Sequence, residues 1–136
     1  MGNEWGRTVV LVRDQDAALR FYREAFGARV IHDSTDDGFR YLHLSIGAGG
    51  LWLIPADPGS DDTVGRQTGA HPLGVIYVDD LELVVDSAVA AGSIVLKESA
   101  EDATARFVHV SDVDGNELVL VQLLGAADGA RHRTPH

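Results

Sequence analysis

Two histidines in matching contexts are the residues whose type and spacing most readily suggest chemistry. His43 lies in RYLHLS and His109 in RFVHVS, so each shares a strand face with an aromatic residue, Tyr41 or Phe107. Imidazole titrates near neutral pH, which makes each histidine a candidate general base or a hydrogen-bond donor to a carbonyl or hydroxyl group. The alternative is a half-exposed strand histidine without a chemical role. The sequence alone leaves both interpretations open.

A second cluster of polar residues lies in SDVDGNELVLV, residues 111–121. It begins like a calcium loop, but its glycine comes two positions early and Leu123 stands where the bidentate Glu would be. Ser111, His109 and Asp112 are the residue types of a catalytic triad, yet they are near neighbours in sequence and no oxyanion donors are implied. The segment is more typical of a hairpin: Asp-Gly-Asn makes the turn, and an alternating strand follows.

Composition restricts the possible partners. The chain has no cysteine, which excludes disulfides, thiolate catalysis and cysteine-ligated metals. A net charge of −10 argues against a nucleic-acid partner and permits a cationic small molecule. No apolar run reaches the roughly 20 residues that span a bilayer, and the N-terminus lacks a signal-peptide pattern, so we expect a cytoplasmic protein without a membrane partner.

The elements that must position these residues occur twice, offset by 66 residues. VVLVRD and VIYVDD are short apolar strands, and each ends in an acidic residue suited to N-capping a helix, Asp14 or Asp80. An amphipathic helix follows each strand and stops at Gly27 or Gly92, where a left-handed C-cap is easily adopted. Three further strands follow in each half. The predicted order is therefore strand, helix, strand, strand, strand, repeated once.

This pattern predicts an α+β domain over residues 1–124. Module one spans residues 5–55, a linker rich in Pro, Gly and Asp spans 56–70, and module two spans 71–124. One helix covers only one face of a four-stranded sheet and leaves the other face open, so we expect the second module to cover the open face of the first. Residues 125–136 lack apolar periodicity, and we expect a disordered tail.

The layout and the segments VVLVRDQDAALRFYREAFGARV, VIYVDDLELVVDSAVAAG and RFVHVSDVDGNELVLVQ resemble the vicinal oxygen chelate superfamily. This superfamily includes glyoxalase I, bleomycin-resistance proteins and extradiol dioxygenases, and the resemblance covers about residues 7–122. It implies two tandem βαβββ modules whose curved sheets surround a shared cavity, in chains that frequently form homodimers. It does not fix the function, because this glyoxalase-like fold hosts lyases, isomerases, oxygenases and drug-binding proteins.

Metal-dependent members of the superfamily take one ligand from the first strand and one from the last strand of each module. The matching first-strand positions hold Arg7 and Leu73. The last-strand positions hold Val119 and, in module one, Trp52, or Leu53 if the alignment has no gap. None of these side chains can coordinate a divalent cation. We therefore expect neither a metal nor another cofactor.

A displaced metal site is one alternative. His71 and Glu117 each lie two residues before an expected ligand position, so strand alternation keeps them on the expected face. A catalytic site needs roughly three protein ligands, and module one offers no acidic or imidazole mate at Arg7 or Trp52. The other interpretation is that His71 belongs to the loop and Glu117 faces solvent beside the turn.

Strand alternation also predicts the side chains that line the cavity. The expected ligand-binding residues are Arg7, Leu11, Tyr41, His43, Trp52, Leu73, Tyr77, Phe107, His109 and Val119. Val9, Val75 and Val121 share this face, although such residues could equally fill the core. The Arg7 guanidinium is suited to orienting an anionic or carbonyl group, or it is simply a surface arginine at a frayed strand start.

These observations favour a metal-free protein that binds an apolar or aromatic small molecule, as a resistance or sequestration protein. An alternative is an enzyme, a lyase, isomerase or oxygenase, in which His43, His109 or Arg7 does the chemistry. A third hypothesis is an accessory interaction domain, for which a large exposed apolar patch without an enclosed pocket would be the sign.

Overall fold

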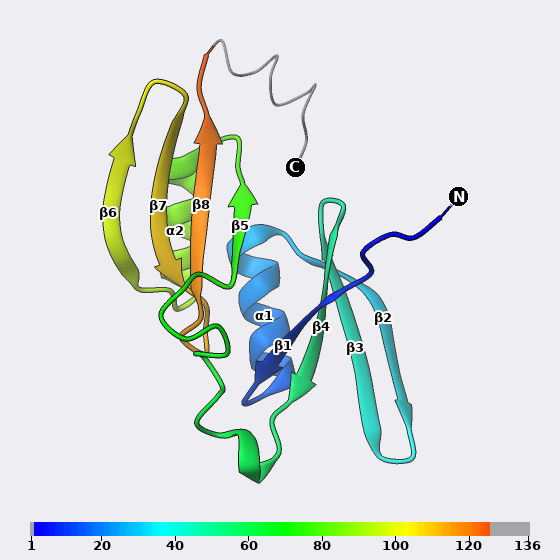
Figure 1. Cartoon of the computed structure of the whole chain (residues 1–136). Helices are drawn as coiled ribbons and strands as arrows, with labels where there is room; N and C mark the ends of the chain where they lie inside the picture. The colour runs from blue at the N-terminus through cyan, green and yellow to red at the C-terminus, as the bar shows by residue number, and fades with distance from the viewer. Residues whose placement is uncertain (1, 126–136) are drawn as a thin grey trace.

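The computed structural model describes residues 2–125 and consists of two four-stranded sheets, each with one helix (Figure 1). Module one contains β1 (Thr8–Val12), α1 (Gln15–Phe26), β2 (Arg29–Asp36), β3 (Phe39–Ile46) and β4 (Gly49–Pro55). Module two contains β5 (Gly74–Tyr77), α2 (Leu81–Ala91), β6 (Val95–Glu101), β7 (Ala105–Ser111) and β8 (Glu117–Leu123). The connecting segment includes one short 3-10 turn, η1 (Pro58–Ser60). The predicted α+β class and the twofold strand, helix, strand, strand, strand order are confirmed.

The two sheets have equivalent strand orders, β1-β4-β3-β2 and β5-β8-β7-β6. In each, the first strand of the module pairs in parallel with the last strand, and the other pairs are antiparallel. The parallel pairing places the start of the first strand beside the start of the last strand. Residues from both ends of each module therefore reach one region of the sheet.

The predicted helix caps are formed. Asp14 accepts a hydrogen bond from the backbone N–H of Ala17 at 2.9 Å, and Asp80 accepts one from Leu83 at 3.1 Å. Gly27 ends α1 in the left-handed region with φ of 71°, a conformation that costs glycine little. Neither helix has the length and apolar character required to cross a membrane, and no other helix among residues 2–125 has them.

The core lies on the helix side of both sheets, as strand alternation predicts. Its residues on the strands, together with Val78 directly after β5, are Val10, Val12, Leu42, Leu44, Leu53, Val108, Val110, Leu118 and Leu120. These side chains pack with Phe21 and Tyr22 of α1 and Leu81 of α2 in one cluster. On the opposite face, Val9 is 39% exposed and Val75 is 54% exposed. We call this opposite surface the open face of each sheet.

The helices α1 and α2 pack against each other, and each also contacts the strands of its own sheet (Figure 1). Helices therefore occupy the space between the sheets, and the open faces lie on the outer sides. The curved sheets expected to surround one shared cavity do not bring their open faces together within residues 2–125. In a single chain the two open faces are therefore separate surfaces, and each is a candidate half-site.

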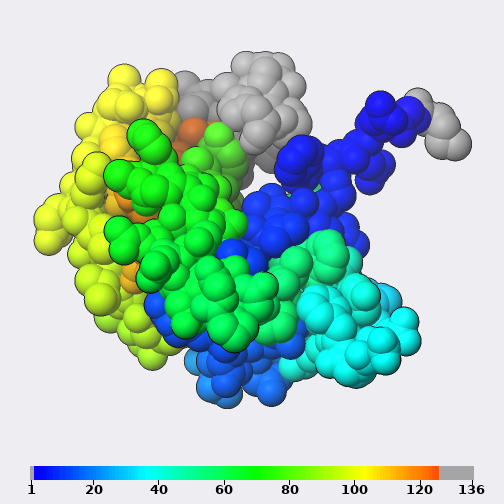
Figure 2. Space-filling model, turned by 60° about the horizontal axis from the view of Figure 1, so that its bottom comes forward, coloured from blue at the N-terminus to red at the C-terminus, as the bar shows by residue number. Residues whose placement is uncertain are grey.

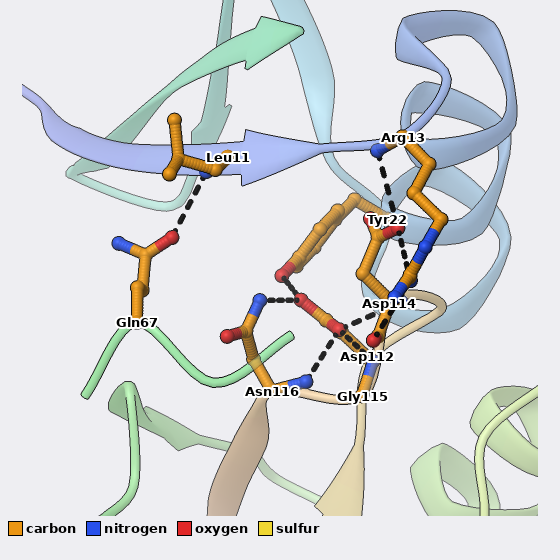
Figure 3. Close-up of polar contacts among 8 residues, drawn as sticks. All are labelled: Leu11, Arg13, Tyr22, Gln67, Asp112, Asp114, Gly115 and Asn116. Carbon is orange, nitrogen blue, oxygen red and sulfur yellow. Dashed lines mark hydrogen bonds and ion pairs between the residues drawn. The ribbon is translucent and has the colours of Figure 1, made fainter. Parts of the chain in front are cut away.

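The turn between β7 and β8 joins the two modules (Figure 3). Asp112, which is 2% exposed, accepts hydrogen bonds at Oδ1 from the backbone N–H groups of residues 114–116. Its Oδ2 accepts from the Tyr22 hydroxyl of α1 at 2.6 Å and from Asn116 Nδ2 at 2.9 Å. Burial, and then the charge of Asp112, raises the pKa of Tyr22 well above its usual value. The predicted hairpin turn is thus also an inter-module contact.

The connecting segment covers the boundary between the modules (Figure 2). Gln67 hydrogen bonds to the edge of β1, accepting from Leu11 N–H at 2.9 Å and donating to Val9 O at 2.7 Å. Gly65 lies against the turn so closely that a Cβ there would come 2.0 Å from the Asp114 carbonyl oxygen. The boundaries predicted for the domain and linker stay predictions, and the predicted tail lies, apart from residue 125, outside the described residues.

Candidate half-sites on the open faces

The open face of module one carries a row of aromatic side chains. Phe39 and Tyr41 are in edge contact with their ring centroids 4.7 Å apart, and Tyr41 stacks on Trp52 at 6.2 Å. The His43 ring lies 5.3 Å from Trp52, to which it is directly opposite in the β3–β4 pairing. The buried Trp52 indole N–H has no hydrogen-bond partner among residues 2–125. Flat rings at these spacings form a surface suited to stacking an apolar or aromatic ligand.

His43 accepts a hydrogen bond from a cationic side chain, that of Arg7. The Arg7 Nε atom donates to His43 Nδ1 at 3.2 Å, and His32 of β2 lies on the other side with its ring centroid 5.3 Å away. Partial burial lowers the pKa of His43, and the charges of Arg7 and His32 lower it further. His43 is therefore neutral at neutral pH.

Arg7 reaches His43 because Gly50 leaves room for it. A Cβ at Gly50 would lie 2.7 Å from the Arg7 Cδ atom and 3.1 Å from the Gly6 carbonyl oxygen. Arg7 lies just before β1, whose parallel pairing with β4 brings it beside that glycine. Arg7 is exposed at the start of the strand, where it hydrogen bonds to His43, and its predicted role in orienting a ligand stays a prediction.

The open face of module two places His109 beside an acid. His109 Nδ1 and Glu117 Oε2 form a short hydrogen bond between β7 and β8, and both side chains are less than one-fifth exposed. The Phe107 ring lies 6.5 Å from the His109 ring, in edge orientation. Lys97 of β6 is directly opposite His109 in the strand pairing. Module two therefore offers a histidine with a carboxylate partner.

The structure brings the predicted ligand-binding residues together in two groups rather than one. Arg7, Tyr41, His43 and Trp52 gather on module one, whereas Phe107 and His109 gather on module two. Leu11 and Val119 are half-buried on the open faces, and Tyr77 is 43% exposed there. Leu73 is half-buried and also packs against the core. Apart from Leu73, these side chains lie on the faces predicted by alternation, and their contact with a ligand stays a prediction.

The displaced metal site is not formed. His71 is exposed in the connecting segment, where its backbone bonds with Thr68. Glu117 is bound to His109 and does not face solvent beside the turn, so the solvent-exposed alternative is also wrong for this residue. Among residues 2–125, no group of three or more His, Asp or Glu side chains could hold a metal ion. The Glu117 carboxylate instead pairs with His109 on the neighbouring strand β7.

A shallow groove of about 230 Å³ lies elsewhere, between α2 and β6. Its lining includes Val85, Val95 and Val108 together with Glu82, Asp86 and Glu98. Val108 is on the helix side of β7, the side opposite His109, so the groove is separate from both half-sites. None of the residues predicted to bind a ligand lines this groove.

Sequence reasoning missed the partners of the two histidines. Glu117 shares the open face with His109, and this alternation was the one available signal for their contact. The Arg7–His43 bond depends on Gly50, whose role becomes visible only in the β1–β4 register. Lys97 and His32 lie beside the histidines through β-bulged pairings that alternation alone does not locate.

Comparison with a family model gives one match, to the Glyoxalase/Bleomycin resistance protein/Dioxygenase superfamily over residues 5–120. No curated protein sequence matches the chain.

Three solved structures illustrate the likeness of fold. The UcmS2 structure is 22% identical with a TM-score of 0.74 and covers 89% of this chain and 98% of its own. TnmS3, an antibiotic binding protein from Streptomyces sp. CB03234, is 23% identical with a TM-score of 0.71, covering 91% and 99%. The fosfomycin resistance protein FosX from Listeria monocytogenes is 13% identical with a TM-score of 0.70, covering 90% and 94%.

Proposed function

Because this chain belongs to the glyoxalase/bleomycin resistance protein/dioxygenase superfamily, we propose that it binds a small apolar or aromatic molecule on its open faces. In this proposal the protein works without a metal, in drug resistance or in sequestration of a toxic compound. The cytoplasmic location stays a prediction from the sequence.

The aromatic row of module one is the observation that carries the proposal. A continuous series of ring contacts lies on the open face, the side of the sheet opposite the core, and joins Phe39, Tyr41, Trp52 and His43. An aromatic ligand stacked there would bury apolar area, and the few polar groups beside the rings would orient it. The description of TnmS3 as an antibiotic binding protein supports a ligand of this class.

We further propose that the chain is a homodimer in which a second copy covers the open faces. Val9 and Val75 are 39% and 54% exposed on strands at the edges of the two sheets, where a partner chain would bury them. A half-site on one chain would then be closed by surface of its partner. Val75→Glu should shift the protein toward monomer in sedimentation velocity, whereas Leu83→Glu, at an exposed position of α2, should not. Monomeric wild-type protein would contradict this assembly.

Binding is tested by isothermal calorimetry and thermal shift against a panel of aromatic compounds and antibiotics. The chain has two tryptophans, so Trp5→Phe leaves Trp52 as the sole tryptophan reporter for ligand quenching. Trp52→Leu should weaken binding of the best ligand by roughly two- to tenfold, since stacking contributes roughly 0.5–1.5 kcal/mol beyond area burial. Trp5→Phe should leave its affinity unchanged, because Trp5 is 82% exposed. If no compound of the panel showed saturable binding, the proposal would be contradicted.

The enzyme alternative is favoured by one observation, the hydrogen bond between His109 and Glu117. A carboxylate that orients an imidazole is an arrangement used in general-base catalysis. Mass spectrometry of each bound compound after prolonged incubation distinguishes the two functions, because a binding protein returns its ligand unchanged. Stoichiometric metal in the purified protein would favour a metal-dependent enzyme instead.

A further inference from the structure

His43 and His109 occupy equivalent positions in the two modules, but their hydrogen-bond partners have opposite charges. His43 is opposite Trp52, and His109 is opposite Val119, so the strand pairing aligns the two modules residue by residue. On this alignment Gly50 stands where module two has Glu117. The partner of His43 comes from the start of β1 and is a donor, whereas the partner of His109 comes from β8 and is an acceptor.

In module one the proton of the neutral imidazole is on Nε2. Arg7 remains protonated at accessible pH, and a guanidinium can only donate hydrogen bonds. Its Nε atom donates to His43 Nδ1, so Nδ1 must be the unprotonated nitrogen that accepts. His43 therefore offers an Nε2–H donor. The positive charge beside it opposes further protonation.

In module two the proton of the neutral imidazole is on Nδ1. An ionised carboxylate only accepts hydrogen bonds, so His109 Nδ1 must donate to Glu117 Oε2. The Nε2 lone pair is left available, and among residues 2–125 no hydrogen bond to Nε2 is formed. The charged groups facing His109 are Glu117 from β8 and Lys97, directly across on β6.

We propose that the His109–Glu117 pair is a proton-accepting site for an acidic hydroxyl group, a phenol or an enol, on an aromatic or conjugated ligand. The hydroxyl proton moves to His109 Nε2, and both electrons of the O–H bond stay on the ligand oxygen as the phenolate or enolate. Glu117 stabilises the imidazolium through Nδ1–H, and Lys97 supplies a cation on the same face for the anionic oxygen. This inference rests on the proposed function, because it names the chemical class of the ligand bound at the same faces.

Histidine tautomers give the first test, and this measurement needs no ligand. Long-range ¹H–¹⁵N spectra of the full chain above the titration range should show His43 protonated at Nε2 and His109 protonated at Nδ1. Glu117→Ala should release His109 toward the Nε2–H form that free imidazole favours, while His43 stays unchanged. His109 protonated at Nε2 in the wild type would overturn the proposal.

A matched pair of chromophoric probes gives the second test. 4-Nitrophenol carries the acidic hydroxyl, and 4-nitroanisole has a methyl group in place of its proton. At a pH below the pKa of the free phenol, wild-type protein should increase the phenolate absorbance band of bound 4-nitrophenol and bind it about tenfold more tightly than the anisole, as expected for a hydrogen bond to a charged group. Glu117→Gln should remove this preference and leave anisole affinity unchanged.

Glu98→Gln on β6 is the control variant, because it makes the same charge change on the groove side of module two. It should retain both the phenolate band and the preference for the phenol. Equal binding of both probes to wild type and Glu117→Gln would overturn the proton-accepting role and leave the proposed aromatic binding intact. Binding of neither probe would count against both proposals.

Discussion

The open faces of modules one and two share a backbone plan and differ in the charge that holds the histidine. Module one places a cation over a glycine and surrounds His43 with aromatic rings, whereas module two replaces that glycine with Glu117 and the tryptophan with Val119. The two modules therefore share the same strand register but carry different side chains at equivalent positions. A duplicated unit can in this way give one half-site suited to stacking and donation and another suited to accepting a proton.

The last hairpins of the modules differ as much as the half-sites do. In module one the β3–β4 turn is short and exposed around Gly47 and Ala48. In module two the β7–β8 turn folds around Asp112, which also binds Tyr22 in the other module. The second hairpin thus stabilises the whole molecule, whereas the first is a local connection.

The largest effect that tests this comparison should come from Asp112→Ala. The change removes the carboxylate that accepts from the buried Tyr22 hydroxyl, the Asn116 amide and three backbone N–H groups of the turn. Of these groups, Gly115 N–H keeps its 3.2 Å bond to the carbonyl oxygen of residue 112. Urea denaturation should show a loss of unfolding free energy on the order of 3 kcal/mol or more. Val113→Ala in the same turn should cost less than about 1 kcal/mol, because Val113 is 41% exposed. Equal losses would show that Asp112 is not the central residue of the turn.

A transplanted half-site should have the next largest effect. The double variant Arg7→Leu/Gly50→Glu gives module one the side chains of module two, and the removal of Arg7 makes room for the new carboxylate. We expect the neutral form of His43 to move its proton from Nε2 to Nδ1, and the unfolding free energy to fall by about 1 kcal/mol, typical for a surface change near a glycine. Gly50→Glu alone should be less stable than the double variant, because Arg7 still occupies the space. An unchanged His43 tautomer in the double variant would contradict the equivalence of the two faces.

Much of this architecture follows from local sequence, and the missing parts are long-range. The sequence predicts those features that depend only on neighbouring residues. These are the helix caps at Asp14 and Asp80, the end of α1 at Gly27, and the alternation that buries Val10 and exposes Val9. The Tyr22–Asp112 bond joins residues 90 apart in the chain, and nothing local indicates it. The Arg7–His43 bond depends on the space above Gly50, and the positions of His32 and Lys97 depend on bulged strand pairings. Side-chain direction was therefore predictable, whereas the contacts across strands and modules were not.

Equivalent arginines offer a finer comparison of the modules. Arg40 binds Asp33 through two parallel hydrogen bonds of 2.9 and 3.0 Å and also contacts Asp16 at 2.7 Å. Its counterpart Arg106 makes longer contacts, 3.2 Å to Glu82 and 3.4 Å to Glu101. Thermal denaturation should therefore show a greater loss for Arg40→Ala, about 1 kcal/mol, than for Arg106→Ala, about 0.5 kcal/mol. High salt should reduce both losses, and an unchanged Arg40→Ala protein would show that the bidentate geometry contributes nothing.

The smallest effect should be the pH response of His43. Burial, Arg7 and His32 lower its pKa in the folded state, so the unfolded chain binds more protons between that lowered pKa and the usual value of about 6.5. Stability therefore falls as the pH drops through this window and is not reduced by His43 above it. Arg7→Leu removes one opposing charge, so NMR titration of the His43 ring should give a higher pKa, and urea denaturation should show a weaker loss on acidification. Arg7→Lys retains the charge and should keep the His43 pKa closer to that of the wild type; an unchanged pKa in Arg7→Leu would mean that the arginine orients the ring without influencing its charge.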